Sequence, residues 1–95
     1  MKKDVIKLSK KYEFKPEKCP FTIYGRIYQI TDSEGEIYYT GTLSHLWKPT
    51  NNANNTYRTS FTSKKFETVE REIKAYIATY SSVGVVENEN FDYDL

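Results

Sequence analysis

The sequence predicts an α+β fold in which one amphipathic helix packs on one face of a three-stranded antiparallel sheet, with an optional short fourth strand. Three observations support this fold. Residues 21–31 and 36–44 are rich in β-branched and aromatic residues and are separated by a short turn sequence. A third strand-like run lies at about residues 56–61. Residues 63–80 carry apolar side chains at helical spacing, and a chain of 95 residues has the length of one small domain.

The turn between the first two strands sets their register. Ser33-Glu34-Gly35 suits a three-residue loop in which Gly35 adopts the left-handed conformation. This loop places Asp32 opposite Glu36, so that odd-numbered and even-numbered residues of the hairpin lie on opposite faces. The odd-numbered face, expected to meet the helix, holds Ile23, Gly25, Ile27, Ile37, Tyr39, Gly41 and Leu43, whereas the even-numbered face holds Thr22, Tyr24, Arg26, Tyr28, Ile30, Tyr38, Thr40 and Thr42.

The helix prediction depends on one stripe of apolar side chains. Ser63 or Thr62 is expected to cap its first amides, with Thr68 as a competing cap if the third strand runs longer. Gly84 is expected to stop it, and residues 83–86 could form a short last strand. The stripe consists of Phe66, Val69, Ile73, Tyr76, Ile77 and Tyr80.

The segments outside this pattern are harder to assign. Val5, Ile6, Leu8 and Tyr12 fit neither a regular helix nor a regular strand, and we interpret residues 4–12 as a short helix. Prolines at positions 16 and 20 make residues 15–20 a connector. The asparagine-rich residues 51–55 predict a polar loop.

Charge divides the chain into three parts: a basic segment at residues 1–20, one α+β domain at 21–86, and an acidic tail at 87–95. Residues 1–18 hold seven lysines against three acidic residues, and residues 87–95 hold four acidic residues and no basic one. We expect the tail to fray in solvent. The formal net charge is only +1, which gives no dense basic field of the kind that strong nucleic-acid binding requires.

The residues that usually carry catalysis or hold metals are scarce. His45 is the only histidine and Cys19 the only cysteine, so no paired nucleophile and base and no thiolate metal cage are expected. The four glycines are scattered and form no phosphate-binding loop. No apolar run approaches the roughly 18 residues of a membrane span. We therefore expect a cytoplasmic protein that is not an enzyme, has no cofactor and does not contact a membrane.

The even-numbered face is the candidate contact surface. If it is open, its tyrosines surround one guanidinium, and Tyr and Arg are enriched where binding energy concentrates. The alternative is structural: cross-strand tyrosine pairs stabilise hairpins, and the N-terminal segment could cover this face. Trp47 is either a core plug or a partner anchor. The sequence favours a protein-binding module, comparable to phage or mobile-element inhibitors and adaptors that occlude a partner, using Tyr24, Arg26, Tyr28, Tyr38 and Trp47.

A second function follows from a resemblance. Three strands followed by a helix that opens on Ser63-Lys64-Lys65 resemble double-stranded-RNA-binding domains, in which such a run contacts phosphates, although small residues are absent at positions 66, 68 and 69. The same order is similar to AP2-like and integrase arm-binding domains, whose open sheet face enters a DNA groove; Phe66-Glu67-Thr68 and Ala75-Tyr76 carry this similarity. The resemblance implies duplex binding through Arg26, Arg58, Lys64 and Lys65. Apart from the resemblance, Tyr24, Tyr28 and Tyr38 are suited to stacking the bases of single strands.

Overall fold

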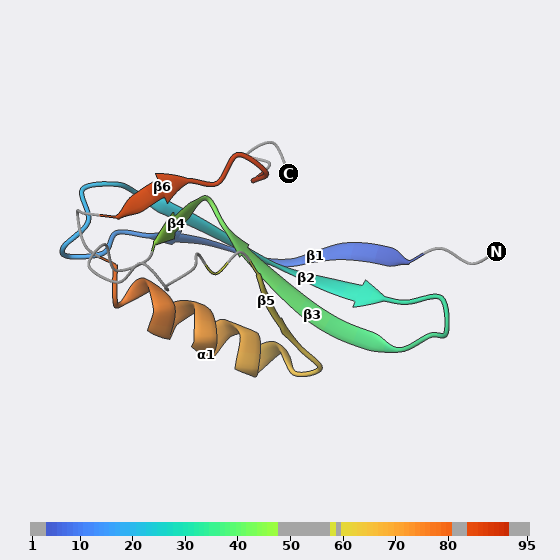
Figure 1. Ribbon diagram of the computed structural model, residues 1–95. Coiled ribbons are helices and arrows are strands. Elements are labelled where there is room, and N and C mark those ends of the chain that lie inside the picture. The colour runs from blue at the N-terminus through green and yellow to red at the C-terminus, as the bar shows by residue number, and fades with distance from the viewer. Residues whose placement is uncertain (1–3, 48–57, 59, 81–83, 92–95) are drawn as a thin grey trace.

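The chain folds into a four-stranded antiparallel sheet with one helix on one face and a separate two-stranded sheet at one end (Figure 1). The computed structural model describes residues 4–47, 58, 60–80 and 84–91. The order of strands in the larger sheet is β1-β2-β3-β5, and the smaller sheet pairs β4 with β6. The predicted α+β class is confirmed. The elements are β1 (Val5–Phe14), β2 (Ile23–Thr31), β3 (Ile37–Leu43), β4 (His45–Trp47), β5 (Phe61–Ser63), α1 (Phe66–Ile77) and β6 (Val85–Glu87).

The β2–β3 hairpin has the predicted register. Gly35 has a φ of 86°, which a residue with a side chain adopts only at a cost. The Gly35 N–H donates to the Asp32 carbonyl at 3.0 Å, and the Asp32 N–H donates to the Glu36 carbonyl at 2.9 Å. Asp32 Oδ1 accepts two further N–H groups of the turn, those of Glu34 and Glu36. The turn therefore pairs Ile30 with Tyr38, as its sequence predicts.

The core lies between α1 and the odd-numbered face of the hairpin. Gly41 lets the helix approach, because an ideal Cβ at this position would lie 2.5 Å from Ile73 Cδ1. Ile37 was expected to face the helix, but it is 45% exposed because it lies at the end of the sheet that α1 does not cover. The buried cluster comprises Cys19, Ile23, Ile27, Leu43, Phe61, Val69, Ile73, Ile77 and Tyr80.

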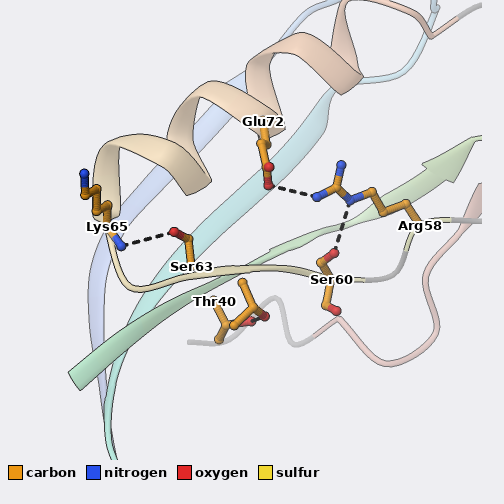
Figure 2. Close-up of polar contacts among 7 residues, drawn as sticks. Thr40, Arg58, Ser60, Ser63, Lys65 and Glu72 are labelled. Carbon is orange, nitrogen blue, oxygen red and sulfur yellow. Dashed lines mark hydrogen bonds and ion pairs between the residues drawn. The ribbon is translucent and has the colours of Figure 1, made fainter. Parts of the chain in front are cut away.

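The helix is shorter than predicted at both ends. It begins at Phe66 after Lys65, which provides no side-chain cap. Ser63 does not cap the helix; its Oγ accepts the Lys65 N–H at 3.2 Å in the turn that precedes it (Figure 2). The helix ends at Ile77, so the expectation that Gly84 stops it is wrong, although Gly84 does have a φ of 89°.

The prediction of a short helix over residues 4–12 is wrong, because this segment forms β1 and pairs antiparallel with β2. A bulge between Leu8 and Lys10 explains the irregular pattern. Before the bulge, Leu8 lies opposite Tyr28 on the even-numbered face of the sheet. After it, Tyr12 lies opposite Gly25 on the face that meets the helix. The bulge thus moves the apolar side chains of β1 from one face of the sheet to the other.

The smaller sheet was predicted only in part. Its strand β6 overlaps the short last strand expected at residues 83–86, but it pairs with β4, which the sequence did not indicate. The third strand of the prediction corresponds to β5, which begins where that prediction ended. The polar loop at 51–55 and most of residues 56–60 lie outside the described residues. No helix in the described parts of the chain is both long and apolar enough to cross a membrane.

Candidate functional site

The even-numbered face of the sheet lies opposite α1, and we call it the open face. Residues that pair across neighbouring strands form rows on it. Ile6, Ile30 and Tyr38 form the first row, across β1, β2 and β3. Leu8 and Tyr28 begin the second row, which continues through Thr40 and Thr62. We call these two rows the apolar rows, because aliphatic and aromatic side chains dominate them.

The apolar rows lie at the end of the molecule that projects into solvent. Figure 1 shows that β1, β2 and β3 extend beyond α1 on one face and beyond β6 on the other. Ile6 is 65% exposed and Leu8 is also exposed, whereas Tyr28 and Tyr38 are half-buried. Ile30, in the middle of its row, is buried. A contiguous apolar surface is thus available on the open face at this end.

Arg26 belongs to the third row, between Lys11 and Thr42. The sequence left open whether this guanidinium is exposed at the centre of the face or covered; in the structure Arg26 is only 6% exposed. Its guanidinium carbon lies 4.7 Å from the centre of the Phe91 ring, a cation–π geometry. The segment that follows β6 therefore covers this part of the open face.

Hydrogen bonds hold that covering segment in place. The Asn88 backbone N–H donates to the Ser44 carbonyl at 2.8 Å, and its side-chain Nδ2 donates to the Leu43 carbonyl at 3.0 Å. Phe91 is 7% exposed, and its N–H donates to the Asn88 carbonyl at 3.1 Å. The expectation that the acidic tail frays in solvent is therefore wrong for the part of it that the structure describes.

The remaining predicted contact residues lie at different places. Tyr24 is exposed beside the covered part of the open face, and its N–H donates to Ser44 Oγ at 2.8 Å. Trp47 is half-buried in β4, where its ring stacks on Tyr80 at 6.0 Å and its carbonyl accepts the Tyr76 hydroxyl. These contacts favour the core-plug interpretation of Trp47. Tyr28 and Tyr38 are the predicted residues that the structure brings together on the open face.

The predicted nucleic-acid contacts do not gather on one face. Figure 2 shows the Arg58 guanidinium directed at α1, where it forms an ion pair with Glu72 at 2.9 Å. Arg58 also lies over the Phe61 ring at 4.1 Å. Lys64 and Lys65 are exposed before the first turn of α1. Arg26 lies on the opposite side of the sheet from Arg58.

The sequence did not predict a polar cluster that lies between β1 and α1. Glu70 Oε2 accepts the Lys10 ammonium at 3.0 Å and the Tyr12 hydroxyl. The hydrogen bond from Tyr12, together with that from Lys10, lowers the pKa of Glu70, whereas burial followed by the contact with Glu70 raises the pKa of Tyr12. Only the assignment of β1 as a strand would have suggested this cluster.

The described residues offer little for catalysis or metal binding. Among them, no group of three histidine, cysteine, aspartate or glutamate side chains is arranged to hold a metal ion. Ser44 Oγ lies 2.9 Å from His45 Nδ1, but Ser44 is fully buried, which keeps its hydroxyl from a substrate. No family model, curated protein or solved structure matches this chain.

Proposed function

We propose that this chain is a small non-enzymatic protein-binding module that acts by occluding a partner protein through the open face of its sheet. One observation carries the proposal: the apolar rows expose Ile6 and Leu8 beside the half-buried Tyr28 and Tyr38. Exposed contiguous apolar surface commonly marks an interaction site in small proteins. Tyrosines add large, stiff and amphipathic contact area at such sites.

The structure shifts the centre of the proposed surface away from the residues that first suggested it. Arg26 is covered by Phe91 and Trp47 packs on Tyr80, so neither is among the contact residues that we propose. Ile6 and Leu8 take their place, because the register of β1 before the bulge puts both residues on the open face. The proposed contact residues are therefore Ile6, Leu8, Tyr28 and Tyr38, with Tyr24 at the border.

Nucleic-acid binding through the same face has less support. Duplex binding needs several basic side chains on one surface, because phosphate contacts supply much of the affinity. Here Arg26 is buried on the open face and Arg58 is paired with Glu72 on the helix side.

Site-specific photocrosslinking tests the proposal. A benzoylphenylalanine in place of Tyr38 samples the open face, and one in place of the exposed Arg71 samples the outer side of α1. In extracts of cells that express the protein, we expect a discrete protein adduct from position 38 and none from position 71. Ile6→Asp should remove the adduct without lowering the melting temperature, because Ile6 is 65% exposed. Equal adducts from both positions, or adducts with nucleic acid only, would contradict the proposal.

A further inference from the structure

The outer edge of β1 is a free sheet edge of unusual length. Within the part of the chain that the structure describes, β1 is the terminal strand of the larger sheet and pairs with β2 on one side only. It has ten residues, whereas a strand in a globular protein has about five or six. Residues 5–11 are all exposed. An edge strand presents backbone N–H and C=O groups that another strand can pair with, so this edge is a template for strand addition.

The two halves of β1 differ in how firmly they are held. In the second half, Lys10 and Tyr12 are tied to Glu70 of α1, and Tyr12 stacks on Phe14 at 5.3 Å. The first half projects beyond α1 (Figure 1), and Val5 there is 63% exposed. Natural edges are commonly protected by lysines and bulges. The bulge of β1 follows Leu8, which leaves residues 5–8 as a regular edge with apolar side chains.

Charge indicates what kind of strand fits this edge. β1 carries Lys7, Lys10 and Lys11 against a single acid, Glu13. Two copies of β1 side by side would bring these lysines together, and like charges on neighbouring strands are destabilising. A strand with acidic side chains would instead meet the lysines favourably.

The face of the sheet on which each β1 residue lies sets where the apolar and acidic side chains of an added strand must be. Ile6 and Leu8 lie on the open face, and Lys7 between them points to the other face. A strand added beside them would match if its apolar side chains continued the apolar rows and its acidic side chains lay next to Lys7. An alternating apolar and acidic sequence has this arrangement.

We propose that an extended segment of the partner protein, with alternating apolar and acidic side chains, adds as a fifth strand to the outer edge of β1 along residues 5–8, before the bulge. This inference rests on the proposed function and deepens it by assigning the kind of partner segment. Backbone hydrogen bonds to β1 would supply affinity, and contacts to Ile6, Leu8 and Lys7 would supply selectivity.

The test uses a fluorescein-labelled peptide of alternating valine and glutamate as the probe. We expect it to bind and to slow amide hydrogen exchange along β1. Methylating alternate backbone nitrogens on its hydrogen-bonding edge should weaken binding by at least about tenfold, because the peptide keeps its charge but loses its ladder. A peptide with lysine in place of glutamate should not bind.

Variants of the protein locate the site. Lys7→Glu should weaken binding of the valine–glutamate peptide by at least about tenfold, since it turns an attraction into a repulsion. Lys18→Glu makes the same change of charge at an exposed position of the connector and should leave binding unaltered. Unfolding curves of both variants establish that each is folded.

Three outcomes would overturn the strand-addition proposal: no binding of the peptide, equal binding of its N-methylated form, or a dimer of this chain in sedimentation that forms through β1. These outcomes leave the photocrosslink at position 38 unaffected, and the proposed function stands or falls on that measurement. Loss of the crosslink with intact peptide binding would instead contradict the open-face function and retain the edge site.

Discussion

Gly41 is where the helix approaches the sheet most closely, so its missing side chain has an energetic consequence. An ideal Cβ there would lie 2.5 Å from Ile73 Cδ1 and 3.0 Å from Val69 Cγ1, and both residues are buried in the core. We expect Gly41→Ala to lower the free energy of unfolding by about 1–3 kcal/mol, the usual range for overpacking. Denaturant unfolding at equilibrium measures this loss.

Gly25 provides the matched control on the same face. A Cβ at Gly25 would meet Leu43 Cδ2 and Phe14 Cε2, both at 3.1 Å. Neither contact is as close as that at Gly41, so Gly25→Ala should cost less than Gly41→Ala. If the two variants lose the same stability, close helix approach is not the reason for glycine at position 41.

Glu70 should make the stability of this protein sensitive to acid. Its pKa is lowered in the folded state, chiefly by the hydrogen bond from Tyr12 and then by that from Lys10. A lowered folded pKa stabilises the protein above the ordinary glutamate pKa of about 4.3, and this contribution is lost as the pH falls through the folded value. Glu70→Gln should therefore be less stable than the wild type near neutral pH, and the difference should shrink in acid.

Unfolding curves of both proteins across this pH range measure the effect. Glu67→Gln is the control, because Glu67 is exposed in the same helix. A difference between wild type and Glu70→Gln that stays constant with pH would show that the carboxylate charge of Glu70 does not contribute.

At the level of the elements, the sequence correctly predicted the features that interactions between residues close in the chain determine. The hairpin register follows from Gly35 and Asp32, whose hydrogen bonds fix the turn without help from the rest of the chain. The helix follows from its apolar stripe, of which Val69, Ile73 and Ile77 are buried. The two faces of the hairpin were therefore assigned correctly, although Ile37 is exposed because α1 does not cover that end of the sheet.

The errors arose where distant pairing decides. The apolar side chains of β1 change from one face of the sheet to the other at the bulge after Leu8. A bulge depends on the partner strand, so the sequence of β1 alone did not reveal it. β4 and β6 have three residues each and form only because they pair across forty residues of chain, as His45 with Glu87. The burial of Arg26 under Phe91 depends on this pairing, so the candidate surface could be predicted only in outline.

Asn88 should be the anchor of the segment that follows β6. Its side chain donates to the Leu43 carbonyl and accepts the Asn90 N–H, and it is buried. We expect Asn88→Ala to lower the free energy of unfolding by about 1–3 kcal/mol, because a buried carbonyl loses its donor. The variant should also raise the accessibility of Arg26. Stability measurements and chemical labelling of arginine test the two effects.

Asn90→Ala is the control for this anchor, since the Asn90 side chain is exposed and the bond it shares with Asn88 uses its backbone N–H. If Asn88→Ala leaves Arg26 as protected as before, the Asn88 side chain is not what holds the segment over Arg26.

The whole molecule has a core at one end and a projecting blade of sheet at the other. Its radius of gyration is 14.3 Å, and its extents are 45 × 28 × 24 Å. A compact domain of this length is expected to have a radius of gyration of about 12.4 Å. The excess fits the projecting strands of Figure 1, whose apolar rows lie beyond the helix. The same shape that leaves Ile6 and Leu8 accessible also leaves this end of the sheet without the cover that Phe91 gives Arg26.

This asymmetry predicts unequal amide exchange along one hairpin. Hydrogen-bonded and non-hydrogen-bonded residue pairs alternate along an antiparallel pair of strands. Because the Asp32 N–H donates to the Glu36 carbonyl, the pairs Ile30–Tyr38 and Arg26–Thr42 are both of the hydrogen-bonded kind. Ile30 and Tyr38 should open locally and exchange at least about tenfold faster, since neither α1 nor the segment after β6 extends over their end of the hairpin, whereas Arg26 and Thr42 should exchange near the global rate. Native-state exchange followed by NMR measures both pairs. Uniform protection would mean that the projecting end of the sheet is as firmly held as the core. Binding of a partner would then not need to order this end of the sheet.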